Sequence, residues 1–397
     1  MTDGDHDARL GRALERLHAV EAVTPPASLA RIVDVVSDIV GARGGRLLVA
    51  DYALRWLQEL DDHGPVGEPI AIEGTLAGHA FALGEVVAAG DDPIVLRVPL
   101  VDGQERIGLI ELELDEWDAR DAAVLAPVIR TVVLMMVANR RYTDAWMRAR
   151  RALPLSAAAE VQWDLLPPLS ASSGDIGVAG ILEPAYTIGG DSFDYAFNHQ
   201  SLDFAIIDAI GHGMSAVLMA VTAINGLRNV RRERGALEAS YLQVDELIAR
   251  QFGDSYYVTG QFGSLDLDSG MLRWINAGHV LPLLVRNGTY AGELTCAPSM
   301  PMGLGGPVVQ IADEPLQRGD RVLFYTDGIT ESIAPHGEFF GTARLADYLV
   351  RATLDRVSVA ETVRRLSANV LAFVGGTLRD DATMFLIEYR AQLPDPT

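Results

Sequence analysis

The second half of the chain contains short aliphatic segments that each end beside an acidic residue. Residues 202–207 lead into Asp208, residues 321–326 lead into Asp327, and residues 383–389 start just after Asp380 and Asp381. Apolar runs of this length, bounded by turn residues, predict buried strands. Because strand ends in a packed sheet gather at one rim, the pattern predicts a strand-rich domain with a cluster of carboxylates at one edge.

Such a cluster indicates a metal site. Four carboxylates at one rim would repel one another unless cations neutralised them, and oxygen ligands suit Mg²⁺ and Mn²⁺. Two such ions could activate water and hold phosphoryl oxygens for an in-line displacement. Taken singly, Asp191 or the pair Asp327-Gly328 also fits a turn or a helix cap. The recurrence of an aspartate at four strand ends favours the metal site.

Composition excludes several other classes of protein. The chain has 397 residues, and all 32 basic residues are arginines, which excludes mechanisms that need a lysine, such as Schiff-base catalysis. The net charge of −22 disfavours nucleic-acid binding. The single cysteine, Cys296, cannot close an intrachain disulfide. The amino-terminal residues are polar, and no apolar run is predicted to approach the roughly 18 residues that span a bilayer. We therefore expect a cytoplasmic protein without membrane insertion.

The pattern of elements predicts three regions: an α+β domain at 1–139, a helical connector at 140–168 and a second domain at 169–397. The first region combines helical patterns with strands of an antiparallel sheet. It contains no metal-ligand spacing. The pair Arg97–Leu100 and Arg106–Leu112 resembles a GAF sensor domain, which implies a small-molecule or protein signal as its ligand.

The connector is predicted to be helical and rich in arginine. Pro154 should break it, and a second helical piece should end at Pro167 and Pro168. A solvated arginine face is favoured over a polybasic binding site. Trp146 and Met147 are predicted to be exposed on this arginine-rich helix without a partner in the chain, so the connector is predicted to pair with a second copy in a parallel homodimer.

Five ordered motifs resemble the SpoIIE- and RsbU-like branch of the bacterial protein phosphatase 2C (PP2C) family. They are G-G-D-S-F-D at 189–194, D-A-I-G-H-G-M-S-A at 208–216, N-A-G-H at 276–279, D-R-V-L-F-Y-T-D-G-I-T-E at 320–331 and R-D-D-A-T at 379–383. The resemblance runs from about residue 157 to residue 389. It implies an α-β-β-α sandwich in the second domain and a serine/threonine phosphatase with two Mn²⁺ or Mg²⁺ ions. It also implies a phosphorylated anti-sigma-factor antagonist as substrate.

The resemblance also assigns roles to individual residues. Asp191 and Asp208 match the bridging metal ligands, and Ala209 matches a position whose carbonyl oxygen binds one ion. The remaining ligands match Asp327 and the pair Asp380 and Asp381, of which Asp381 stands where many relatives have asparagine.

The two histidines of these motifs are open to more than one interpretation. His212 is a candidate general acid or a residue that holds its loop, and His279 is interpreted as part of a structural turn. Residues 183–190 lack the arginine with which eukaryotic relatives hold the phosphate. The residue that contacts the substrate phosphate is therefore unassigned.

Two other functions compete with this interpretation. Gly-Gly-Asp-Ser-Phe resembles the Gly-Gly-Asp-Glu-Phe signature of diguanylate cyclases, but Ser192 replaces the glutamate and the later aspartates have no place in that fold. The second alternative is an inactive phosphatase-like scaffold that only binds a regulatory partner. The presence of every metal aspartate favours the enzyme.

Overall fold

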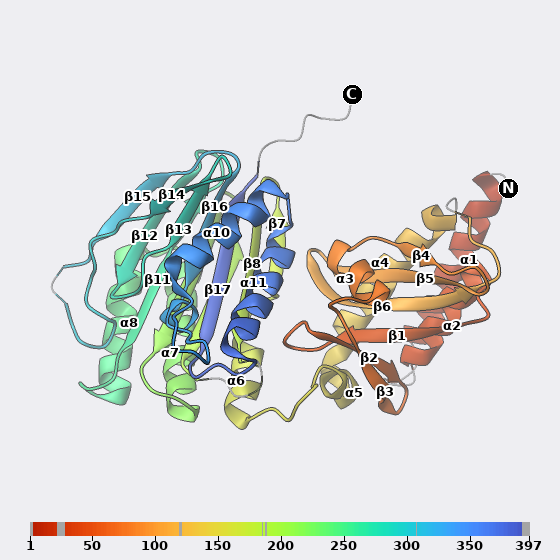
Figure 1. Ribbon diagram of the computed structural model, residues 1–397, viewed down its shortest axis with the longest axis horizontal. Coiled ribbons are helices and arrows are strands. Elements are labelled where there is room, and N and C mark those ends of the chain that lie inside the picture. The colour runs from red at the N-terminus through yellow and green to blue at the C-terminus, as the bar shows by residue number, and fades with distance from the viewer. Residues whose placement is uncertain are drawn as a thin grey trace. The chain divides into compact units, whose positions relative to one another are not determined.

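The computed structural model describes residues 3–21, 28–118, 121–184, 186, 189–306 and 308–390. The chain divides into two compact units, Met1–Pro154 and Leu155–Thr397 (Figure 1). Each unit has its own sheets and its own hydrophobic core.

The first unit is built on one antiparallel sheet of six strands, in the order β3-β2-β1-β6-β5-β4. The strands are β1 (Gly44–Ala50), β2 (Trp56–Asp61), β3 (Gly64–Ala71), β4 (Val87–Ala89), β5 (Ile94–Asp102) and β6 (Glu105–Leu114). Three helices, α1 (Asp3–Glu21), α2 (Ser28–Val40) and α4 (Ala122–Asn139), share a core with this sheet, and α3 (Leu76–Leu83) contacts β3, β5 and β6. The predicted α+β organisation is confirmed, while the GAF relationship stays a prediction.

Helix α4 corrects one expectation. It has 18 residues and is long and apolar enough to cross a membrane by length and composition. The expectation that no apolar run reaches that length was therefore wrong. Eight of its side chains, including Val128 and Val132, are buried in the core of the first unit, which is the behaviour of a core helix in a folded domain.

The segment predicted to be a separate connector packs onto the two units instead. A 3₁₀ turn, Arg140–Tyr142, and α5 (Asp144–Ala149) belong to the first unit, and α6 (Ala157–Leu165) belongs to the second. Trp146 is only 4% exposed, and Met147 accepts a hydrogen bond of 3.4 Å from the Tyr52 hydroxyl. The prediction that both side chains are exposed was wrong, so the homodimer loses the argument on which it rested. The break near Pro154 is confirmed.

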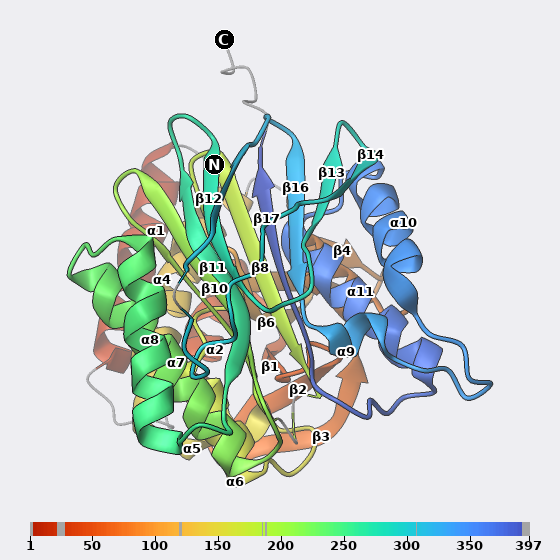
Figure 2. The same ribbon diagram turned by 90° about the vertical axis from the view of Figure 1, so that its left-hand side faces the viewer.

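The second unit is an α-β-β-α sandwich, as predicted (Figures 1 and 2). One sheet has the order β15-β12-β11-β10-β9 and the other the order β14-β13-β16-β17-β8-β7. The first sheet consists of β9 (Asp191–Phe197), β10 (Ser201–Ala209), β11 (Val258–Asp266), β12 (Met271–Ala277) and β15 (Ile311–Pro315). The second consists of β7 (Ser170–Ser173), β8 (Ile176–Glu183), β13 (Leu283–Arg286), β14 (Thr289–Glu293), β16 (Asp320–Tyr325) and β17 (Ala382–Tyr389).

Helices cover the outer face of each sheet, and aromatic side chains fill the space between the sheets. The first sheet packs against α7 (Met214–Arg232) and α8 (Leu237–Phe252), and the second against α10 (Gly341–Leu354) and α11 (Val359–Val374). Between the sheets, the ring centroids of Phe204 and Phe324 lie 4.6 Å apart and those of Phe193 and Phe385 lie 5.7 Å apart. This aromatic layer fixes the spacing at which the strand ends of the two sheets face each other.

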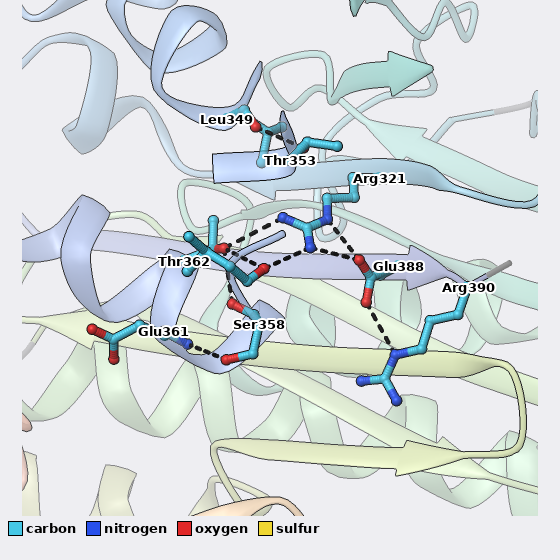
Figure 3. A network of polar contacts seen from close by, with 9 residues as sticks. Arg321, Leu349, Thr353, Ser358, Glu361, Thr362, Glu388 and Arg390 are labelled. Atoms are coloured by element: carbon cyan, nitrogen blue, oxygen red, sulfur yellow. Dashed lines mark hydrogen bonds and ion pairs between the residues drawn. The ribbon is translucent and has the colours of Figure 1, made fainter. Parts of the chain in front are cut away.

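A buried arginine anchors α11 to the second sheet (Figure 3). Arg321, at the start of β16 and 4% exposed, donates hydrogen bonds to Glu388 Oε1 at 2.8 Å and to the carbonyl oxygen of Val357 at 2.6 Å. Arg390 donates to the other oxygen of Glu388 at 3.0 Å. The two arginines neutralise Glu388, which allows this ion pair to be buried between helix and sheet.

Candidate active site and metal centre

The predicted aspartates come together where the two sheets end. Asp191 starts β9 and lies directly opposite Asp208 near the end of β10. In the other sheet, Asp327 follows β16 as the first residue of the short helix α9 (Asp327–Thr330), and Asp380 and Asp381 immediately precede β17. Because β16 and β17 are antiparallel neighbours, the end of one strand lies beside the start of the other.

The pKa values show that these carboxylates act on one another. Burial, together with the charges of Asp208 and Asp381, raises the pKa of Asp191 well above its usual value. Burial and the charges of Asp327, Asp380 and Asp381 raise the pKa of Asp208 to about 7. Burial and the charge of Asp380 raise the pKa of Asp381 to about 6. The causes of these three pKa shifts include no positively charged side chain, so the negative charge of the carboxylates is not neutralised by them.

One threonine joins the two sheets at this rim. The hydroxyl group of Thr326, which is fully buried, donates a hydrogen bond of 2.6 Å to Asp191 Oδ2. The hydroxyl oxygen of Thr326 in turn accepts a hydrogen bond of 2.9 Å from the backbone amide of Thr383. Thr326 therefore holds the metal-site strand β9 against β16 and β17. In the sequence, only its position directly before Asp327 could have pointed to this role.

The two glycines before Asp191 allow a close approach that no other residue would permit. A Cβ atom on Gly189 would lie 2.4 Å from Asp381 Oδ2, and one on Gly190 would lie 2.1 Å from the carbonyl oxygen of Ala209. Burial raises the pKa of Asp381, and the backbone N–H groups of residues 189, 190 and 191 oppose that rise. Glycine at both positions therefore brings Asp381 and the Ala209 carbonyl group against the start of β9.

The donors at this rim fit hard divalent cations. They are carboxylate and carbonyl oxygens, which Mg²⁺ and Mn²⁺ prefer, and their mutual repulsion would be relieved by a cation. Over the described ranges, no three His, Cys, Asp or Glu side chains are drawn tightly together around one point. The carboxylates are close enough to shift one another's pKa values. The fit to a metal ion therefore rests on the chemistry of these oxygens and not on a complete set of ligands around one point.

The two histidines of the motifs have different surroundings. His212 is exposed in the loop between β10 and α7. His279 is engaged at both ring nitrogens, with Nδ1 lying 3.0 Å from the Thr259 hydroxyl and Nε2 lying 3.1 Å from the carbonyl oxygen of Tyr325. Burial lowers the pKa of His279 to about 4, so its imidazole is neutral at physiological pH. The structure thus supports the structural interpretation of His279, and the solvent accessibility of His212 is compatible with a general acid.

The fold of the second unit is of the PP2C type. It is similar to the SiaA-PP2C domain of Pseudomonas aeruginosa, with a TM-score of 0.51 and 22% sequence identity, over 59% of this chain and 94% of that one. Residues 198–390, which make up most of the second unit, match the family described as Stage II sporulation protein E (SpoIIE). The sequence match and the fold thus agree on the same region of the chain.

Two curated relatives extend the comparison. The chain is 22% identical over 334 residues to Protein IcfG of Synechocystis sp., a match that covers 76% of this chain and 49% of IcfG. It is 22% identical over 242 residues to the phosphoserine phosphatase RsbU of Bacillus subtilis, a match that covers 59% of this chain and 69% of RsbU. The chain thus spans about half the length of IcfG and about two thirds of RsbU.

Proposed function

We propose that this protein is a metal-dependent serine/threonine protein phosphatase. The observation that carries the proposal is the group of carboxylates from both sheets, Asp191, Asp208, Asp327, Asp380 and Asp381, among which burial and mutual repulsion raise the pKa of Asp208 to about 7. The match to the SpoIIE family supports the same activity. So many carboxylates at one edge of the sheets destabilise the fold, and the binding of cations explains why they are there.

Each acid has a proposed role. Asp191 and Asp208, paired across the β9–β10 ladder, would bridge two Mn²⁺ or Mg²⁺ ions, and the carbonyl oxygen of Ala209 would bind one of them. Asp327, Asp380 and Asp381 would supply the remaining ligands from the second sheet. Such ions, when bound, lower the pKa of a water molecule and orient phosphoryl oxygens.

The protein's own contribution is to hold these oxygens in place and to protonate the leaving group. Thr326 holds Asp191 in place before any substrate binds, and the backbone N–H groups of residues 189–191 favour the ionised form of Asp381. His212, exposed beyond the end of β10, is the proposed proton donor to the leaving serine or threonine oxygen.

The proposed substrate is a phosphoserine or phosphothreonine on a partner protein. The phosphoserine phosphatase RsbU supports this substrate chemistry. The motif resemblance further suggests an anti-sigma-factor antagonist as the partner, with regulation by a signal that binds the GAF-like first unit. A cytoplasmic location is part of the same proposal, whereas the homodimer, which the burial of Trp146 leaves without its argument, is not carried into it. The competing function, an inactive scaffold, would keep the fold and the partner while lacking hydrolysis.

A phosphoserine peptide assayed with and without Mn²⁺ separates the enzyme from the scaffold. The wild-type chain should release phosphate only with Mn²⁺ or Mg²⁺, and Asp208→Asn should abolish the release. Asp203→Asn is the matched control. Asp203 lies on the same strand as Asp208, but its carboxylate accepts hydrogen bonds from Asn198 and Ser201 and is not one of the proposed metal ligands. Metal-independent release, or equal activity of wild type and Asp208→Asn, would contradict the proposal.

A further inference from the structure

The Asn276–His279 turn is closed by hydrogen bonds of its own. The side-chain amide of Asn276 donates to the carbonyl oxygen of His279 at 2.9 Å, and the amide N–H of His279 donates to Asn276 Oδ1 at 2.6 Å. These two bonds fix the backbone of His279 at the end of β12 (Met271–Ala277). The point from which the imidazole extends is therefore fixed by the turn.

The hydrogen-bond chemistry of the imidazole fixes its tautomer. A carbonyl oxygen only accepts, so Nε2 carries the proton that is donated to Tyr325. Nδ1 of the neutral ring must then accept the hydroxyl hydrogen of Thr259. Thr259 has one such hydrogen, so its longer 3.4 Å contact with the carbonyl oxygen of Asp208 is the weaker of its two interactions. Both ring nitrogens are thus hydrogen-bonded, Nδ1 to the side chain of Thr259 and Nε2 to the backbone of Tyr325.

The two partners of His279 belong to different sheets, and each is close to a proposed metal ligand. Thr259 lies directly opposite Asp208 in the β10–β11 ladder. Tyr325 is the last residue of β16, two positions before Asp327. The imidazole therefore spans the gap between β11, which neighbours the strand that carries Asp208, and β16, which leads to Asp327.

We propose that His279 is a positioning residue that holds Asp208 and Asp327 at the separation required for metal binding. The inference rests on the proposed function, and it extends the structural role of the N-A-G-H turn to the metal site itself. The carboxylates on the two sheets repel one another, and that repulsion tends to open the rim. Thr326 ties Asp191 to the second sheet, and the Thr259–His279–Tyr325 bridge is a second, separate tie at Asp208.

Thr259→Val tests the bridge with little change of shape. Valine is β-branched like threonine and suits a strand, but it has no hydroxyl hydrogen for Nδ1. Residues that orient metal ligands typically contribute about 10- to 100-fold to metal affinity. We expect the Mn²⁺ dissociation constant of full-length Thr259→Val, measured by isothermal titration calorimetry on metal-free protein, to rise by at least about 10-fold. Thr259→Ser, which retains the hydroxyl, should restore affinity close to that of the wild type.

Gln261→Met is the matched control. Gln261 lies on the same strand and donates a hydrogen bond of 2.8 Å to the carbonyl oxygen of Val280, in the same turn, but its contacts do not include Asp208 or Tyr325. Its loss should lower thermal stability without changing Mn²⁺ affinity. If Thr259→Val folds poorly, the comparison moves to His279→Ala and the double variant. The double variant should bind Mn²⁺ no more weakly than His279→Ala, because both changes remove one bridge.

The outcomes separate the two hypotheses. Wild type that binds no Mn²⁺ contradicts the proposed function and removes the basis of the bridge. Wild type that binds Mn²⁺, with Thr259→Val binding equally well, overturns the positioning role alone. A Thr259→Ser variant as weak as Thr259→Val, a Gln261→Met variant with equally reduced affinity, or additive losses in the double variant would also overturn it.

Discussion

Replacing Asp208 with asparagine should stabilise the metal-free protein while it abolishes function. Burial and neighbouring carboxylates raise the pKa of Asp208 from 3.8 to about 7. Ionisation of Asp208 therefore destabilises the folded protein. The stability that the neutral carboxyl group allows is fully present below pH 4 and is lost as the pH rises through about 7. At about 1.36 kcal/mol per pKa unit, the difference corresponds to up to roughly 4 kcal/mol at pH 8. Asparagine, which is neutral throughout, escapes this loss.

This effect can be measured in the second unit alone by hydrogen exchange of peptides from β10. Urea is varied to obtain the free energy of unfolding, and EDTA keeps the protein free of metal. In metal-free protein, the free energy of unfolding of Asp208→Asn should exceed that of wild type at pH 8, and the gap should narrow at pH 5. Added Mn²⁺ should stabilise wild type and leave the variant unchanged. Asp203→Asn should show neither effect. Equal stability of wild type and Asp208→Asn at pH 8 would refute the claim that the ionised carboxylate of Asp208 destabilises the metal-free fold.

Three further outcomes follow from the structure. Asp327→Asn should reduce Mn²⁺-dependent phosphate release to background while its circular dichroism spectrum matches wild type; substantial residual release would contradict its assignment as a ligand. Residues 155–397 alone should retain Mn²⁺-dependent hydrolysis in the peptide assay, because every proposed ligand and the cores around both sheets lie in this unit; a folded fragment that binds Mn²⁺ without hydrolysis would show that the first unit completes the site. Arg321→Met should cost roughly 3 kcal/mol of stability in urea denaturation, because it leaves Glu388 without its buried partner. Its Mn²⁺ affinity should stay that of wild type, since Arg321 is at the opposite end of β16 from Asp327, and a loss of affinity would contradict this separation.

The acidic rim could be predicted because local sequence carries its pattern. Strands β10, β16 and β17 are mostly apolar, and each proposed ligand lies within two residues of a strand end. These signals depend on near neighbours in the chain, and therefore they survive without knowledge of the fold.

The contacts that join distant segments could not be predicted in this way. The hydrogen bond between Thr326 and Asp191 links residues 135 positions apart, and no periodicity marks it. Trp146 was expected to be exposed because its local segment is polar, yet it is buried in the core of the first unit. Helix α1 has few apolar residues, although Leu17 is fully buried in that core. In each case tertiary packing decides the outcome and local composition does not.

The relation between the acidic rim and metal ions is tested most directly by diffraction from crystals of the full chain soaked in Mn²⁺, with data collected near the manganese absorption edge. The account predicts two anomalous peaks at the rim, with oxygens of Asp191 and Asp208 near both. Oxygens of Asp327 and of Asp380 or Asp381 should complete the two sites from the second sheet. Crystals that diffract well, yet show no anomalous density within coordination distance of these carboxylates at millimolar Mn²⁺, would contradict the metal centre and with it the proposed phosphatase.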